Sequence, residues 1–173
     1  MFGVYENFPE MHHGVVRFSH KNPTKELQKV LIQCLCQLNQ QEEELDIPES
    51  SRHNVNIKMD FGIADGLTFN YLNKEVLQHC QAISSQQTFP ALDFLCIIRY
   101  YAKEKGKRSP LRFDYHMLRF LFRESEVELQ VFHEKGTRRL STEDLVTFLA
   151  EKINRALARG RSSPLRMNYI RAL

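Results

Sequence analysis

Segments in which apolar and polar residues alternate constrain this chain most, because a period of two residues is typical of a β-strand with one buried face. The clearest run covers residues 55–63, and a second run, 67–71, follows after Ala64-Asp65-Gly66. Two such runs joined by so short a link predict a β-hairpin. A two-residue turn at Asp65-Gly66 would place Phe61 and Phe69 on opposite faces. A three-residue loop, 64–66, pairs these two rings, so we predict the three-residue loop.

Further extended segments follow the same logic. Residues 14–18 predict a short strand, since β-branched and aromatic residues dominate them. Residues 91–103 alternate as a strand does, although the proline before them and the glycine after them are also typical of helix boundaries; their aromatic and β-branched content favours the strand. Residues 111–117 alternate, and the apolar positions then change parity, which predicts a bulge near Met117-Leu118. Residues 127–131 predict one more strand.

Three segments have the three-and-four spacing of helices with one buried face. The first opens at Asn22-Pro23 and runs to Leu38, the second is capped by Asn73, and the third runs from Ser141 to Gly160. Residues 40–51 are rich in acidic side chains, so we expect a polar loop there. The resulting order, β-α-β-β-α-β-β-β-α, predicts an α+β fold: a mainly antiparallel sheet with helices packed on one face.

The chain of 173 residues is long enough for one domain with a buried core, which we place at residues 1–160, followed by an extended basic tail, 161–173. The tail repeats the Gly/Ser-Pro-Leu-Arg pattern of residues 106–115, which suggests that it pairs with a sheet edge of this chain or of a partner. The four cysteines lie inside apolar periodic segments, which predicts buried free thiols and a reducing, intracellular compartment, cytoplasm or nucleus. No segment is long and apolar enough to predict a membrane span.

Charge divides the chain. Residues 1–98 carry 7 Lys/Arg and 12 Asp/Glu, whereas residues 99–173 carry 17 and 9, a net charge of −5 against +8. Basic and aromatic side chains alternate between residues 99 and 123, a composition that suits single-stranded nucleic acid. We therefore predict a non-catalytic module that binds an anionic partner, with nucleic acid, and single strands in particular, as the favoured partner. The expected contact residues are Lys103, Lys105, Lys107, Arg108, Arg112, Arg138, Arg139 and Arg161.

Two other classes of function remain open. The acidic half, the basic half or the tail can serve a protein-interaction subunit, such as an adaptor or a homodimer. A small enzyme is the third class, because Asp114 and His116 are two residues apart on a predicted strand and share a face, as a general base and its orienting carboxylate require. A solvated strand face explains the same two residues better, and the sequence lacks the usual motifs for phosphate-loop, dinucleotide or zinc-protease chemistry. We predict no metal and no cofactor.

Overall fold

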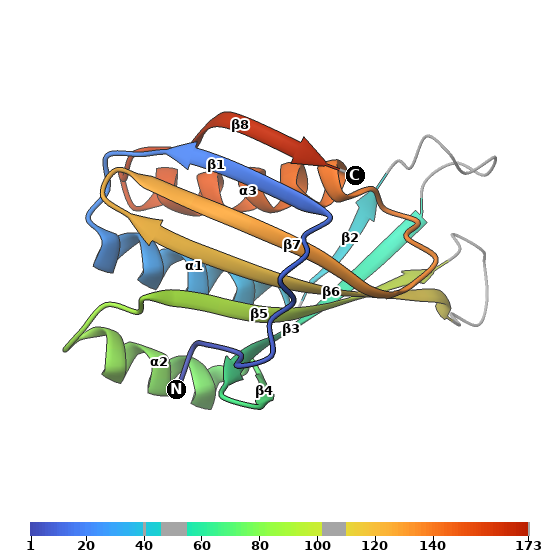
Figure 1. Ribbon diagram of the computed structural model, residues 1–173, viewed down its shortest axis with the longest axis horizontal. Coiled ribbons are helices and arrows are strands. Elements are labelled where there is room, and N and C mark those ends of the chain that lie inside the picture. Colours follow the sequence, from blue (N-terminus) through green and yellow to red (C-terminus); the bar gives the residue numbers. More distant parts are fainter. Residues whose placement is uncertain (40, 46–54, 102–109, 173) are drawn as a thin grey trace.

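The computed structural model describes residues 1–39, 41–45, 55–101 and 110–172. It confirms an α+β single domain built on one antiparallel sheet with three helices (Figure 1). The elements follow the predicted order with two additional strands, β2 and β8. Their bounds are β1 (Gly14–Ser19), α1 (Thr24–Leu38), β2 (Glu42–Leu45), β3 (Val55–Asp65), β4 (Thr68–Tyr71), α2 (Lys74–Ser84), β5 (Ala91–Tyr101), β6 (Pro110–Arg123), β7 (Glu126–Gly136), α3 (Thr142–Arg159) and β8 (Arg166–Ala172).

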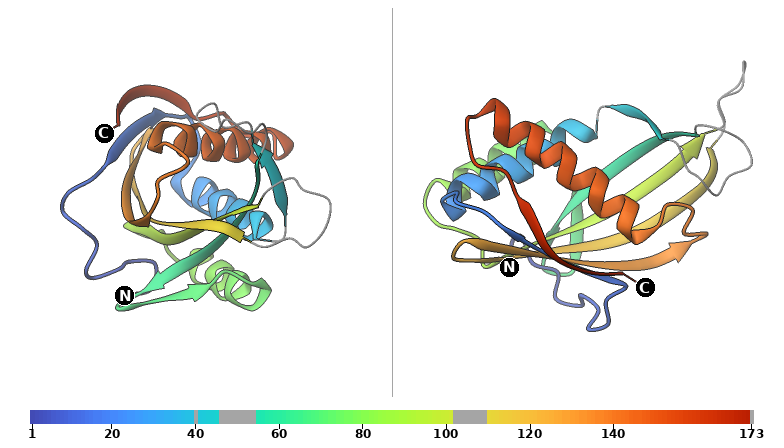
Figure 2. Two further views of the ribbon diagram at one scale, coloured as in Figure 1. Left: turned by 90° about the vertical axis from the view of Figure 1, so that its right-hand side faces the viewer. Right: turned by 90° about the horizontal axis from the view of Figure 1, so that it is seen from above.

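The sheet has the strand order β2-β3-β5-β6-β7-β1-β8, and β4 is a third partner of β3. Strands β5, β6 and β7 are consecutive and form its centre. Figure 2 shows that the sheet curls around α1, while α3 lies across the open side of the curl. Because α1 is surrounded in this way, adjacent residues such as Leu31 and Ile32 are both buried, which a helix on a flat surface does not allow. None of the helices in the described part of the chain is long and apolar enough to cross a membrane.

Strand β2 lies where we expected a loop. Its four residues pair with β3, with Glu43 opposite Ile57 and Leu45 opposite Val55, so the loop prediction for 40–51 is wrong for this part. The pairing provides backbone hydrogen bonds to an acidic segment that has no apolar periodicity of its own. Residues 91–101 form β5, which confirms the strand interpretation as far as Tyr101.

The hairpin register differs from both of our alternatives. Asp65 lies opposite Thr68 and Ala64 opposite Phe69, so the turn consists of Gly66 and Leu67 and the predicted three-residue loop is wrong. Phe69 therefore lies on the face opposite to Phe61. On that face, the ring of Tyr5 packs against the Phe69 ring with 4.7 Å between the centroids. The N-terminal segment thus supplies the apolar contact that we had assigned to the other strand.

The prediction for β6 was also wrong. Its pairing with β5 runs without a shift from Ala91↔Leu121 to Tyr100↔Arg112, so the bulge predicted at Met117-Leu118 does not occur. Irregular register falls instead between Tyr115 and His116 on the β7 side and beside Tyr101 on the β5 side. The even-numbered residues face the helices along the strand, and the aromatic odd-numbered residues face outward.

The N-terminal segment crosses the outer face of the sheet and is held there by a buried ion pair. The Asp93 carboxylate, which is fully buried, accepts hydrogen bonds from Nε and Nη2 of Arg119, both at 2.7 Å. It also accepts the backbone N–H of Tyr5 at 2.7 Å, and the guanidinium lies over the ring of Phe8. The same pair of side chains therefore joins β5, β6 and the first residues of the chain.

The predicted tail becomes β8, which pairs antiparallel with β1. Before β8, the side-chain amide of Asn22 donates to the Ser163 carbonyl and accepts the Ser163 N–H. The side-chain amide of Asn154 makes the same two hydrogen bonds with the backbone of Leu165. These paired contacts fix the path of the chain from α3 to the sheet edge. Asn22 was expected to cap α1, but Pro23 occupies the cap position and no side chain caps the helix.

Candidate functional site

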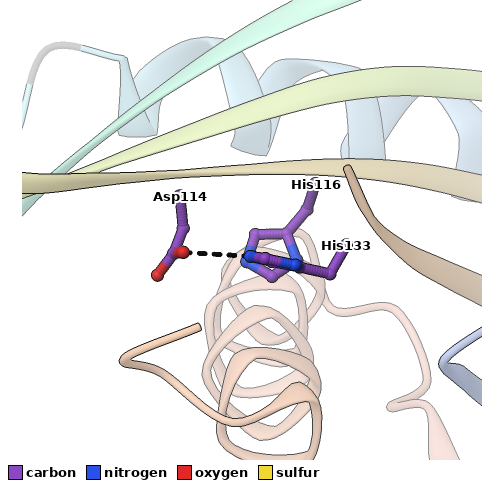
Figure 3. Close-up of side chains that lie close together, drawn as sticks. All are labelled: Asp114, His116 and His133. Carbon is purple, nitrogen blue, oxygen red and sulfur yellow. Dashed lines mark hydrogen bonds and ion pairs between the residues drawn. The ribbon is translucent and has the colours of Figure 1, made fainter. Parts of the chain in front are cut away.

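A polar cluster lies on the inner face of the sheet, where β6 and β7 approach α3. Asp114 and His116 come from β6, and His133 comes from β7 directly opposite His116. Figure 3 shows the three side chains projecting together from the sheet. Asp114 and His116 are completely buried, so the interpretation of these residues as a solvated strand face is wrong.

The Asp114 carboxylate accepts four hydrogen bonds. Oδ2 accepts the Tyr100 hydroxyl at 2.6 Å and the Arg139 backbone N–H at 3.0 Å. Oδ1 accepts the Arg138 backbone N–H at 2.7 Å and lies 3.0 Å from Nε2 of His133. Burial by itself raises the pKa of Asp114, but these hydrogen bonds outweigh it and the net pKa is lowered. The cluster therefore contains a buried carboxylate that stays ionised.

His116 is the unusual member of the cluster. Its side chain is fully buried, and neither Nδ1 nor Nε2 has a hydrogen-bond partner within the described part of the chain. Its ring lies edge-on to that of His133 with 4.9 Å between the centroids. Burial, followed by the charge of His133, lowers the pKa of His116 to about 4, so the imidazole is neutral at pH 7 and offers a free lone pair. Buried polar atoms without partners are rare and call for an explanation.

His13, directly before the start of β1, adjoins the cluster. Its Nδ1 accepts the backbone N–H of His133 at 2.9 Å, and its ring stacks on Phe132. Burial, and then the positive charges of Arg138 and His133, lower the pKa of His13. The sequence signal for this site was limited to the spacing of Asp114 and His116; His13 and His133 are far away in the chain and are brought in by strand pairing.

The donor set of the cluster, one carboxylate and two imidazoles, is one that first-row transition metals prefer. One ligand atom from each of Asp114, His116 and His133 lies within 4.8 Å of the others. Contact with a substrate, by contrast, would require opening of the chain that covers the cluster, since Asp114 and His116 are fully buried. The geometry thus suits a bound ion better than an exposed general base.

The reverse face of the same strands carries aromatic and basic side chains. Phe113 is 40% exposed and lies opposite Arg99 of β5, while Tyr115 is half-buried and lies opposite Lys135 of β7. The Lys135 ammonium lies 4.4 Å from the centroid of the Tyr115 ring. Together with Tyr101 of β5, these residues form what we call the outer patch: Arg99, Tyr101, Phe113, Tyr115 and Lys135.

The structure divides the basic residues that we predicted as contacts. Arg112 is exposed near the start of β6, but it lies opposite Tyr100 and so on the other face of the strand from the outer patch. Arg138 and Arg139 are half-buried, and their backbone N–H groups bind Asp114. Arg161 follows the other end of α3, a helix of 18 residues and about 27 Å, so it is remote from this end of the sheet. The remaining four predicted residues lie outside the described part of the chain: Lys103, Lys105, Lys107 and Arg108.

No family model, no curated protein and no solved structure matches this chain.

Proposed function

We propose that the protein is a non-catalytic module that binds single-stranded nucleic acid on the outer patch. The observation that carries this proposal is the facing of β6. Because Asp114 and His116 point toward the helices, Phe113 and Tyr115 point outward, next to the cations Arg99 and Lys135. Single strands bind to such surfaces by stacking bases on aromatic rings while cations contact the phosphates.

The position of the patch suits an extended ligand. The N-terminal segment covers the outer face near Asp93 and Arg119, whereas the patch lies toward the other ends of β5 and β6, where Tyr101 pairs with Pro110 (Figure 1). These two residues flank segment 102–109, whose sequence includes four basic residues and one acidic residue. Arg99 already forms an ion pair with Asp60, so we assign most of the phosphate contacts to Lys135 and this segment.

Fluorescence anisotropy with labelled oligonucleotides tests the proposal. We expect binding to single-stranded RNA or DNA in preference to duplex and to heparin, with an affinity that falls steeply with salt. Phe113→Ala weakens binding by between about fivefold and about 150-fold, the range for loss of one stacked base. Tyr169→Ala is the matched control, because Tyr169 is an aromatic side chain of similar exposure, 43%, on β8. Equal affinity of the Phe113→Ala variant and the wild type would overturn the assignment of the patch.

Charge reversal at Lys105, Lys107 and Arg108 together tests the electrostatic part. We expect loss of binding and a shallower dependence on salt, with little change in melting temperature. Full affinity in this variant would show that segment 102–109 is not part of the binding surface.

A second candidate function, protein interaction, rests on β8. This strand pairs with β1 on one edge, all seven of its residues are exposed, and three of them are large and apolar: Met167, Tyr169 and Ile170. An exposed strand edge of this kind can receive a strand from another protein or from a second copy. Light scattering would detect a dimer, and Asn168→Pro, which removes a backbone donor from β8, should abolish it.

A further inference from the structure

We propose that Asp114, His116 and His133 form a binding site for one divalent first-row transition metal ion of the zinc class. Two independent observations support the site. The three side chains place their ligand atoms within 4.8 Å of one another, and His116 is fully buried with both ring nitrogens unpartnered in the described part of the chain. A metal ion would satisfy one of these nitrogens, which explains a buried polar group that no hydrogen bond accounts for.

The geometry of the pair Asp114–His133 is close to what a metal needs. Nε2 of His133 and Oδ1 of Asp114 are 3.0 Å apart. Ligand atoms about 2.0 to 2.2 Å from a tetrahedral zinc ion lie roughly 3.3 to 3.6 Å from one another, so these two atoms need to separate by only a few tenths of an ångström. The three ligand atoms lie within 4.8 Å of one another, so the ring of His116 would have to rotate to reach the same ion. Binding requires the tautomer of His133 that keeps its proton on Nδ1 and presents the lone pair of Nε2.

The surroundings of the cluster hold the ligands in place. The Tyr100 hydroxyl and the Arg139 backbone N–H keep Oδ2 of Asp114 fixed. Oδ1 accepts the Arg138 backbone N–H with one lone pair, and its other lone pair would face the ion. The backbone N–H of His133 is held by Nδ1 of His13. Contacts of this type orient ligands in metal sites and tune their affinity. With three protein ligands, the fourth position of a tetrahedral ion would be open to water or to a further donor.

The charge of the site predicts its selectivity. Asp114 is the sole carboxylate of the three-residue group, and Arg138 lies close enough to lower the pKa of His116 and His13. A site with one negative charge and two imidazoles should reject Mg²⁺ and Ca²⁺, which require several oxygen ligands, and accept Zn²⁺ and Co²⁺.

Titration of the chelator-treated protein with Co²⁺ tests the proposal. We expect one Co²⁺ per chain, with the visible absorption bands of a low-symmetry site, displaced by Zn²⁺ and unaffected by Mg²⁺. Zinc at one hundred times its dissociation constant should raise the melting temperature by about 5 to 10 °C. His116→Leu removes a ligand and should abolish both effects. His20→Asn is the matched control, because His20 is also buried and its Nε2 also has no partner among the described residues.

Nuclear magnetic resonance of the histidine ring nitrogens keeps the test independent of the variants. Added Zn²⁺ should shift the ring nitrogens of His116 and His133 and leave those of His20 unchanged. Absence of Co²⁺ absorption together with unchanged His116 resonances would overturn the proposal, as would equal stoichiometry in the His116→Leu variant. The metal test is separate from the proposed function, since nucleic-acid binding on the outer patch can fail while metal binding on the inner face is retained.

Discussion

The ion pair between Asp93 and Arg119 gives the sharpest prediction about stability. Asp93 is fully buried, whereas the Arg119 side chain retains 23% exposure. Removing the cation in Arg119→Met leaves a carboxylate that cannot reach water, which costs about 4 kcal/mol of unfolding free energy. Removing the charge of the acid in Asp93→Asn leaves a guanidinium that can partly rehydrate, so we expect a smaller cost, about 3 kcal/mol. The double variant Asp93→Asn/Arg119→Met should cost about 2 kcal/mol less than the sum of the single variants.

Urea unfolding followed by circular dichroism measures these differences, with the slope against urea concentration as a check that the folded state is unchanged. Lys152→Met is a suitable control, because Lys152 forms a 2.7 Å ion pair with Glu43 in which both side chains stay partly exposed. Its loss should cost less than about 1 kcal/mol. Strict additivity in the double variant, or a cost for Arg119→Met no larger than that for Lys152→Met, would refute the reasoning.

Three further predictions concern other parts of the chain. Burial lowers the pKa of His20 from 6.5, so the unfolded chain takes up a proton that the folded chain resists, and stability should fall as the pH drops through about 6.5. His20→Asn should flatten this slope in urea unfolding, and an unchanged slope would contradict the burial of His20. Gly136→Ala should destabilise the protein by about 3 kcal/mol or more, because Gly136 has φ +116° and an added Cβ would collide with the Asp114 carboxylate; a near-neutral effect in thermal unfolding would contradict this contact. The four thiols should react with a thiol reagent only after unfolding, since burial raises the pKa of Cys34 to about 11 and that of Cys80 to about 12; rapid reaction of the native protein would contradict their burial.

Features governed by local chemistry were predictable from the sequence. Two of the three helix caps illustrate this: the side chain of Asn73 accepts the Val76 N–H, and the side chain of Ser141 accepts the Asp144 N–H, as the spacing predicts. Apart from β2, the extended segments and their order also followed from the sequence pattern, because a strand or helix buries one face regardless of which partner covers it. The predicted fold class was therefore confirmed.

Features governed by distant partners were not predictable. Alternation alone places the apolar residues of 111–117 inside, yet Asp114 is inside because Tyr100, His133 and the chain after β7 supply its hydrogen bonds. Phe69 likewise faces away from Phe61 because Tyr5, 64 residues earlier, covers it. The candidate metal site depends on the same long-range pairings, whereas nucleic-acid binding remains a prediction that began with composition and now has a defined surface.

The place of β1 in the sheet also has a consequence for how the protein is made. This strand lies near the start of the sequence, at residues 14–19, yet its neighbours in the sheet are β7, at 126–136, and β8, at 166–172. At the usual rate of translation, about 5 to 20 residues per second, roughly 5 to 20 seconds pass before the first neighbour leaves the ribosome's catalytic centre. During that interval Val15, Val16 and Phe18 have neither of their final strand partners. Nascent chains of this protein should therefore expose an unpaired apolar strand until late in synthesis, which makes them substrates for chaperones that recognise such segments.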